Sequence, residues 1–110
     1  MEIKVTIHKI TNPGANPPWV QCSFRDAWGR KHTIHEKLPV VMANASAAIK
    51  LPATGSIACR LLRRWQDNRG RQLVTITTRE PWDIESTQGL CEFDLPQSAL
   101  LAASSLLSQP

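Results

Sequence analysis

Polar and apolar residues alternate along several short segments, and this period constrains the fold more than any other feature of the chain. A period of two places successive side chains on opposite faces of a half-buried β-strand. Two early segments show it, with apolar positions at Ile3, Val5, Ile7, Val20, Cys22 and Phe24. The sequence predicts an all-β domain over residues 1–95, a small closed or partly open antiparallel β-barrel of about six strands, with an open two-layer sheet as the alternative.

One turn pattern, D-x-x-G-R, occurs twice, at residues 26–30 and 67–71. A three-residue hairpin loop is commonly a type I turn followed by a left-handed residue, so aspartate suits its start and glycine its left-handed position. Each copy therefore predicts a β-hairpin in which Gly29 or Gly70 has a positive φ. We interpret the repeat as turn chemistry and not as two copies of a binding motif.

The first hairpin decides whether the two nearby histidines, His32 and His35, form a site. Pairing of Asp26 with Arg30 sets the opposed residues as Phe24 with His32, Cys22 with Ile34, and Gln21 with His35. Alternation then directs His32 and His35 to opposite faces, so the two rings cannot bind one ion. We expect no metal site and no structural zinc, and His32 is interpreted as a hydrogen-bonded, partly buried strand residue.

Catalytic signatures are absent from the sequence. It contains no G-x-S-x-G motif, phosphate-binding glycine loop, EF-hand or C-x-x-C pair. The cysteines, Cys22, Cys59 and Cys91, are widely spaced in apolar runs and are expected to be reduced, buried thiols. Two pairs of carboxylates, Asp83 with Glu85 and Glu92 with Asp94, are expected on a solvated strand face. The sequence thus predicts a protein that is not an enzyme and has no cofactor.

The segment GSIACRLLRRWQ has apolar residues on both faces, as expected for a central strand, a bulge or a barrel stave, and not for a free edge. Five arginines crowd the hairpin that it begins: Arg60, Arg63, Arg64, Arg69 and Arg71. With the adjacent Trp65 they fit either a groove for single-stranded nucleic acid or a solvated basic rim. The net charge of +4 permits a nucleic acid or an acidic protein as partner.

The last third of the chain gives two further expectations. Trp82 follows Pro81 at a strand end and is interpreted as a cap on the core. Residues 96–110 change composition to Ala, Ser and Leu and are expected to form a short C-terminal helix, carrying Leu100, Leu101 and Leu107, or a frayed tail. The start of the sequence lacks a long apolar run, so we expect a cytoplasmic protein without membrane contact.

Several landmarks together carry a resemblance. They are the D-x-x-G-R hairpin, the segment EKLPVV, the strand GSIAC, the second G-R hairpin and PWDIES with a downstream glycine. Over residues 19–95 the chain resembles small, uncharacterised bacterial β-barrel proteins that are similar to the barrel domains of elongation factor Tu. Some barrels of this size are immunity proteins. The resemblance implies a barrel fold and a toxin domain as partner, and it transfers no binding residues.

The hairpin tips are the predicted binding site. Large side chains there do not serve the core, and protein interfaces are rich in Trp and Arg. The predicted partner-binding residues are Trp28, Arg30, Arg69 and Arg71. We therefore expect a non-enzymatic module that binds another protein, with an OB-like protein for single-stranded nucleic acid as the alternative. Trp28 has a second interpretation, in which it packs over its own hairpin.

Overall fold

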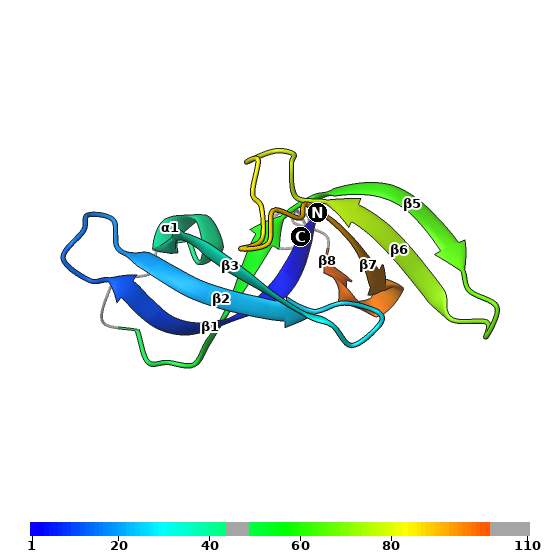
Figure 1. Cartoon of the computed structure of the whole chain (residues 1–110), viewed down its shortest axis with the longest axis horizontal. Coiled ribbons are helices and arrows are strands. Elements are labelled where there is room, and N and C mark those ends of the chain that lie inside the picture. The colour runs from blue at the N-terminus through cyan, green and yellow to red at the C-terminus, as the bar shows by residue number, and fades with distance from the viewer. Residues whose placement is uncertain (44–48, 102–110) are drawn as a thin grey trace, which may run out of the picture.

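The computed structural model describes residues 1–43 and 49–101. Over these residues the chain forms two antiparallel sheets, side by side along the long axis of the molecule (Figure 1). The elements are β1 (Glu2–Asn12), β2 (Trp19–Arg25), β3 (Lys31–Lys37), α1 (Leu38–Val41), β4 (Ala53–Ala58), β5 (Arg60–Gln66), β6 (Gln72–Thr77), β7 (Glu92–Pro96), the 3-10 helix η1 (Gln97–Ala99) and β8 (Leu100–Leu101).

The strand order is β3-β2-β1-β4 in the first sheet, with β8 also paired to β1, and β5-β6-β7 in the second. The all-β, antiparallel prediction is confirmed. Hydrogen bonding among the described strands does not close either sheet into a barrel, so the predicted barrel is not confirmed.

The apolar positions of the alternating segments form one core that both sheets share. The first sheet contributes Ile3, Val5 and Ile7 among others, and the second contributes Val74, Ile76, Phe93 and Leu95. Ile7, Val74 and Ile76 are fully buried. Burial of this apolar surface, at roughly 25 cal/mol per Å², is what holds the two sheets together.

The segment predicted as one interior strand is two strands. The chain turns at Cys59, so that β4 pairs with β1 in the first sheet and β5 pairs with β6 in the second. Each lies at the end of its sheet order, and the expectation that this segment is not an edge was wrong. The apolar residues that reach the core keep one parity through the change of sheet: Ile57 and Cys59 are buried before and at the break, and Leu61 packs on the core after it, whereas Leu62, of the other parity, is exposed. The register of β5 against β6 shifts between Leu61 and Arg63, which is a β-bulge or a similar irregularity, in line with the bulge alternative.

The predicted C-terminal helix is also corrected. Pro96 ends β7, η1 follows, and Leu100 and Leu101 form β8, which pairs with Ile3 and Glu2 of β1. Strand β2 pairs with β1 only from Thr6 onward, so the backbone of the first residues of β1 has a free edge that β8 fills. Residues 102–110, including Leu107, lie outside the described residues.

Trp82 does not cap the core. Its side chain is 65% exposed, and Ile84, two residues later, is buried instead. The loop between β6 and β7 directs Ile84 inward and Trp82 outward, so the prediction for Trp82 was wrong. In the part of the chain that the structure describes, no helix is long and apolar enough to cross a membrane.

Candidate protein-binding surface at two hairpin turns

The turn between β2 and β3 has the predicted geometry. Gly29 has a φ of 79°, and Asp26 N–H donates to the carbonyl of Arg30 at 2.9 Å. The carboxylate of Asp26 accepts the backbone N–H groups of Trp28 and Arg30 on Oδ1, each at 2.9 Å. Its second oxygen, Oδ2, lies 2.7 Å from Nε2 of the buried His32. The aspartate therefore fixes both the turn and a core side chain.

The turn between β5 and β6 repeats this arrangement. Gly70 has a φ of 81°, and Asp67 Oδ1 accepts the N–H groups of Arg69 and Arg71 at 2.9 and 2.8 Å. Asp67 Oδ2 accepts the Nε–H of Arg71 at 2.8 Å. This hydrogen bond is the largest cause, and the one from the backbone N–H of Arg71 the second largest, of a pKa of the Asp67 carboxyl below its usual value. Both positive-φ predictions are confirmed.

A third turn of the same form occurs at residues 86–90 without any arginine. Ser86 Oγ accepts the N–H groups of Gln88 and Leu90 at 3.3 and 3.1 Å, and Gly89 has a φ of 79°. The sequence pattern here is S-x-x-G, with a serine oxygen in place of the carboxylate. Because the same turn geometry forms with different side chains, the D-x-x-G-R repeat is explained by the needs of the turn and not by a shared binding function.

The two D-x-x-G-R turns meet in space although they are far apart in sequence. Arg71 Nη1 donates to the carbonyl of Ala27 at 3.1 Å, and the Arg71 guanidinium lies 5.1 Å from the centre of the Trp28 ring. Ala27 N–H donates to the carbonyl of Asp94 in β7 at 2.8 Å. Trp28 keeps 53% of its surface exposed. Its cation–π partner comes from the other hairpin, whereas the alternative interpretation had Trp28 packed over its own hairpin.

Trp65 extends this contact across the second sheet. Its ring centre lies 6.4 Å from that of Trp28, and the Arg63 guanidinium lies 4.8 Å from the Trp65 ring. The indole N–H donates to Thr75 Oγ1 at 3.0 Å, and that hydroxyl donates to Asp94 Oδ1 at 2.7 Å. The ring is therefore held in one orientation.

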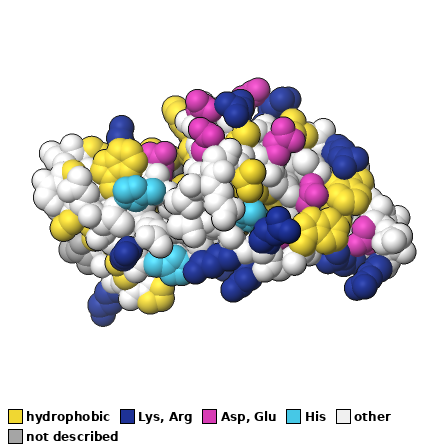
Figure 2. Space-filling view, viewed as in Figure 1, with side chains coloured by type: hydrophobic (Ala, Val, Ile, Leu, Met, Phe, Trp, Pro, Cys, Tyr) yellow, Lys and Arg dark blue, Asp and Glu magenta, His cyan; other side chains and the backbone are white. Residues whose placement is uncertain are grey.

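We call Trp28, Arg63, Trp65 and Arg71 the Trp–Arg patch. In Figure 2, large hydrophobic side chains lie among Lys and Arg side chains at the end of the molecule where these two hairpins are. Of the four predicted binding residues, Trp28 and Arg71 belong to this patch. Arg30 and Arg69 lie in the same turns, with exposed side chains, and supply backbone N–H groups to the aspartates.

Sequence reasoning did not select Arg63 or Trp65 as site residues. Positions two apart on a strand share a face, so this pair was a usable signal. No carboxylate of the described residues lies within ion-pair distance of Arg63, whereas Arg71 is paired with Asp67. The patch is therefore positive and partly apolar.

The histidines lie as the register predicted. Phe24 is opposite His32 and Gln21 is opposite His35. His32 is buried against Phe24 and Phe93, with ring centres at 5.4 and 4.7 Å, and its Nδ1 has no partner among the described residues. His32 is thus more buried, and less fully hydrogen-bonded, than expected.

His35 is exposed on the opposite face of the sheet. It bonds to Thr11 and lies 5.2 Å from the ring of Trp19, beside a shallow hollow that these residues line. Within residues 1–43 and 49–101, no group of three His, Cys, Asp or Glu side chains could hold a metal ion.

Two of the three thiols are buried as expected. Burial, and secondarily the charge of Glu36, raises the pKa of Cys22 to about 12, and burial also raises the pKa of Cys59. Both thiols are therefore protonated and poorly nucleophilic. Cys91 is only half-buried, and its sulfur accepts a hydrogen bond from Arg79 at 3.3 Å.

Comparison with protein-family models, with curated proteins and with solved structures gives no match to this chain.

Proposed function

We propose that the chain is a non-enzymatic protein-binding module and that it binds its partner through the Trp–Arg patch. The observation that carries the proposal is the contact between Trp28 and Arg71, which come from different sheets and are both still partly exposed. Tryptophan and arginine are the residues most enriched among interface hot spots, because each combines a large contact area with a polar group.

The patch is also organised before a partner arrives. Arg71 is held by Asp67 and by the carbonyl of Ala27, and Trp65 is held by Thr75. Side chains already fixed in one conformation lose little rotamer entropy on binding, so more of the contact energy remains as affinity. The positive charge favours a partner with an acidic surface.

A protein partner fits better than a single-stranded nucleic acid because guanidinium groups lie over both indole rings, at 4.8 and 5.1 Å. A base would have to displace an arginine in order to stack on that face. Nucleic acid remains the second candidate, since the exposed Arg30 and Arg69 add further positive charge beside the patch.

The resemblance to immunity proteins supports a more specific form of the proposal, in which the partner is a toxin domain in the cytoplasm. The acidic surface would then belong to that domain. This form requires the two sheets to stay joined through their shared core, and it does not require a closed barrel.

The test is a comparison of variants against a partner captured from the source cell. Trp28→Ala should weaken binding by about 2 kcal/mol, or roughly 30-fold, as truncation of a hot-spot residue typically does. Trp82→Ala is the matched control, because Trp82 is more exposed than Trp28 and lies in a different loop. A folded Trp28→Ala protein with full affinity, or one that unfolds, would place the site elsewhere and assign Trp28 to the structure.

Titration with a single-stranded oligonucleotide separates the two candidates. Binding to nucleic acid weakens steeply as salt rises, in proportion to the number of phosphates contacted. We expect no such binding. Oligonucleotide affinity with a steep salt dependence, lost in Trp28→Ala, would favour the second candidate.

A further inference from the structure

The outer edges of the described strands are not equally available. The free edge of β7 accepts a hydrogen bond at Asp94 from Ala27 N–H, and that of β3 accepts one at Thr33 from Thr87 N–H, each at 2.8 Å. Either contact from a loop interrupts the row of backbone groups that a new strand would need. These two edges are therefore partly covered by the protein itself.

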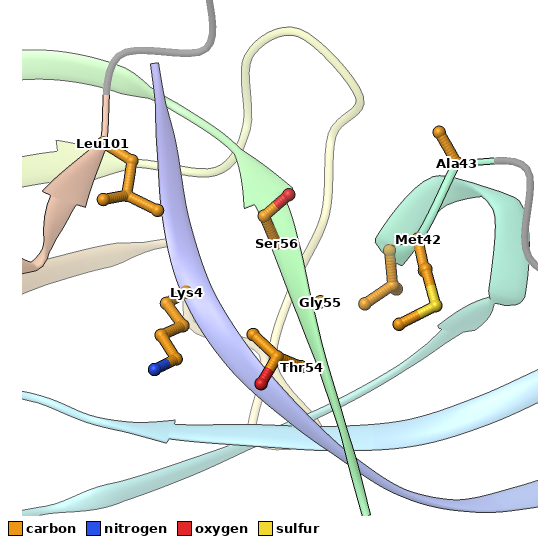
Figure 3. A pocket seen from close by; sticks show the side chains of 8 residues that line it. Lys4, Met42, Ala43, Thr54, Gly55, Ser56 and Leu101 are labelled. Atoms are coloured by element: carbon orange, nitrogen blue, oxygen red, sulfur yellow. The ribbon is translucent and has the colours of Figure 1, made fainter. Parts of the chain in front are cut away.

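The edge of β4 is approached by the end of α1. Figure 3 shows Met42 and Ala43 beside Thr54, Gly55 and Ser56 of this strand. A Cβ atom on Gly55 would lie 2.7 Å from both the side chain and the carbonyl oxygen of Val41, so the helix sits directly against the strand. The hollow in Figure 3 lies over this strand and is lined also by Lys4 and Leu101.

Strand β5 differs from these three. It pairs only with β6, and within the described ranges no backbone hydrogen bond from outside its sheet reaches residues 60–66. The hairpin closes with Asp67 N–H bonded to the carbonyl of Arg71. Because bonded and non-bonded pairs alternate along an antiparallel ladder, the N–H and C=O groups of Gln66 and Arg64 are directed away from β6. These groups form an open row on which another strand can pair.

The side chains of this strand determine what can pair there. Arg60, Arg63 and Arg64 all lie on β5, which has no acidic residue. Only Arg60 has a carboxylate within ion-pair distance among the described residues, that of Glu80 at 2.9 Å. A second copy of β5 would bring like charges together, which is unfavourable. An acidic strand would place negative charges beside these arginines, which is favourable.

We infer that the partner contributes an extended, acidic segment that adds to the sheet as a strand along β5. This inference rests on the proposed function, since Arg63 and Trp65 belong to both β5 and the Trp–Arg patch. Main-chain hydrogen bonds to the edge supply affinity, while the arginines and the exposed Leu62 select the sequence of the segment.

The probe is a blocked eight-residue peptide in which glutamate and valine alternate, titrated into the full chain labelled with ¹⁵N. We expect the amides of Arg64 and Gln66 to exchange with solvent at least tenfold more slowly at saturation. A lysine–valine peptide should bind at least tenfold more weakly, and so should the acidic peptide with every backbone nitrogen methylated. Methylation keeps the charge but removes all main-chain donors.

Arg64→Glu should weaken the acidic peptide at least tenfold. Lys50→Glu is the control, because it makes the same change of charge at an exposed residue outside the described strands. Equal binding of the methylated peptide, or unchanged exchange of the Arg64 and Gln66 amides, would overturn the inference. So would dimerisation of the chain along β5 or equal binding of the lysine–valine peptide.

The two proposals fail in different ways. If Trp28→Ala weakens the captured partner while the β5 amides are unaffected by the acidic peptide and by that partner, the proposed function stands and the strand addition is refuted. If the β5 amides become protected and Trp28→Ala keeps full affinity, the strand addition stands, and binding centred on the contact between Trp28 and Arg71 is refuted.

Discussion

Removal of the Asp26 carboxylate should destabilise the protein more than removal of Asp67, although the two residues begin turns of the same geometry. Both carboxylates accept two backbone N–H groups of their own turn. The third bond differs. Asp26 bonds His32, whose side chain is 3% exposed, whereas Asp67 bonds Arg71, whose side chain is 43% exposed.

The expected cost of Asp26→Ala follows from these contacts. The two turn bonds contribute about 1 kcal/mol each, and their donors can turn to water in the variant. The His32 nitrogen stays buried without a partner, which costs about 2 kcal/mol. The sum is about 4 kcal/mol, a large part of the roughly 5–15 kcal/mol that stabilises a domain of ordinary size. In Asp67→Ala, water can solvate the released Arg71, so the loss should be smaller.

Urea unfolding at pH 7 measures the free energy of unfolding of both variants, and equal losses in the two variants would refute the reasoning.

Unfolding measured over a range of pH adds a second check. Burial tends to raise the pKa of the Asp26 carboxyl, but hydrogen bonds from His32 and from the N–H groups of Arg30 and Trp28 outweigh it and lower the pKa. A carboxyl whose folded pKa is lowered stabilises fully above its unfolded pKa of about 3.9, and this contribution disappears as the pH falls through the folded pKa. The difference between the native protein and Asp26→Ala should therefore shrink below about pH 4.

Three more predictions can be checked on purified protein. Gly29→Ala and Gly70→Ala should each lower the free energy of unfolding by about 1 kcal/mol, because a Cβ is strained at positive φ; Gly14→Ala, where φ is not positive and no atom lies within 4 Å, is the control and should be nearly neutral. Iodoacetamide at pH 8 should modify Cys91 first and leave Cys22 unmodified until the chain unfolds, which mass spectrometry of the peptides will show; prior modification of Cys22 would contradict its burial. Protein purified without added metal should contain no stoichiometric zinc by elemental analysis, because His32 and His35 face opposite ways, and zinc lost together with the fold on chelation would disprove this.

Local chemistry made the hairpins predictable. The positions of aspartate and glycine in D-x-x-G-R specify the turn, and the turn specifies the register, so that the pairing of Phe24 with His32 could be read from the sequence. The same register placed His32 and His35 on opposite faces. Each of these features depends on residues that are close together along the chain.

The features that sequence reasoning missed depend on how the two sheets meet. The change of sheet at Cys59 goes with the pairing of Ala58 to Glu2, and Arg71 contacts Ala27, which lies 44 residues earlier in the chain. The outward direction of Trp82 is not given by a local pattern either. Periodicity gives the buried face of each strand but not the partner of that face. Half of the predicted site, Trp28 and Arg71, came together because both hairpin tips lie at the same end of the fold, which no local pattern encodes.

The partners of strand β1 become available at different times while the chain is being synthesised. A ribosome releases the chain from its N-terminal side, so the β1–β2–β3 meander can form while later residues are still inside the exit tunnel. The free edge at Ile3, however, cannot be paired until Leu100 has been synthesised, and the carbonyl of Met1 cannot accept its hydrogen bond until Cys59 has been. These long sequence separations slow folding, since the entropy of loop closure must be overcome first. Until Leu100 and Leu101 have been synthesised, the starting edge of β1 has no partner on this side, and an unpaired strand edge can pair with another nascent chain.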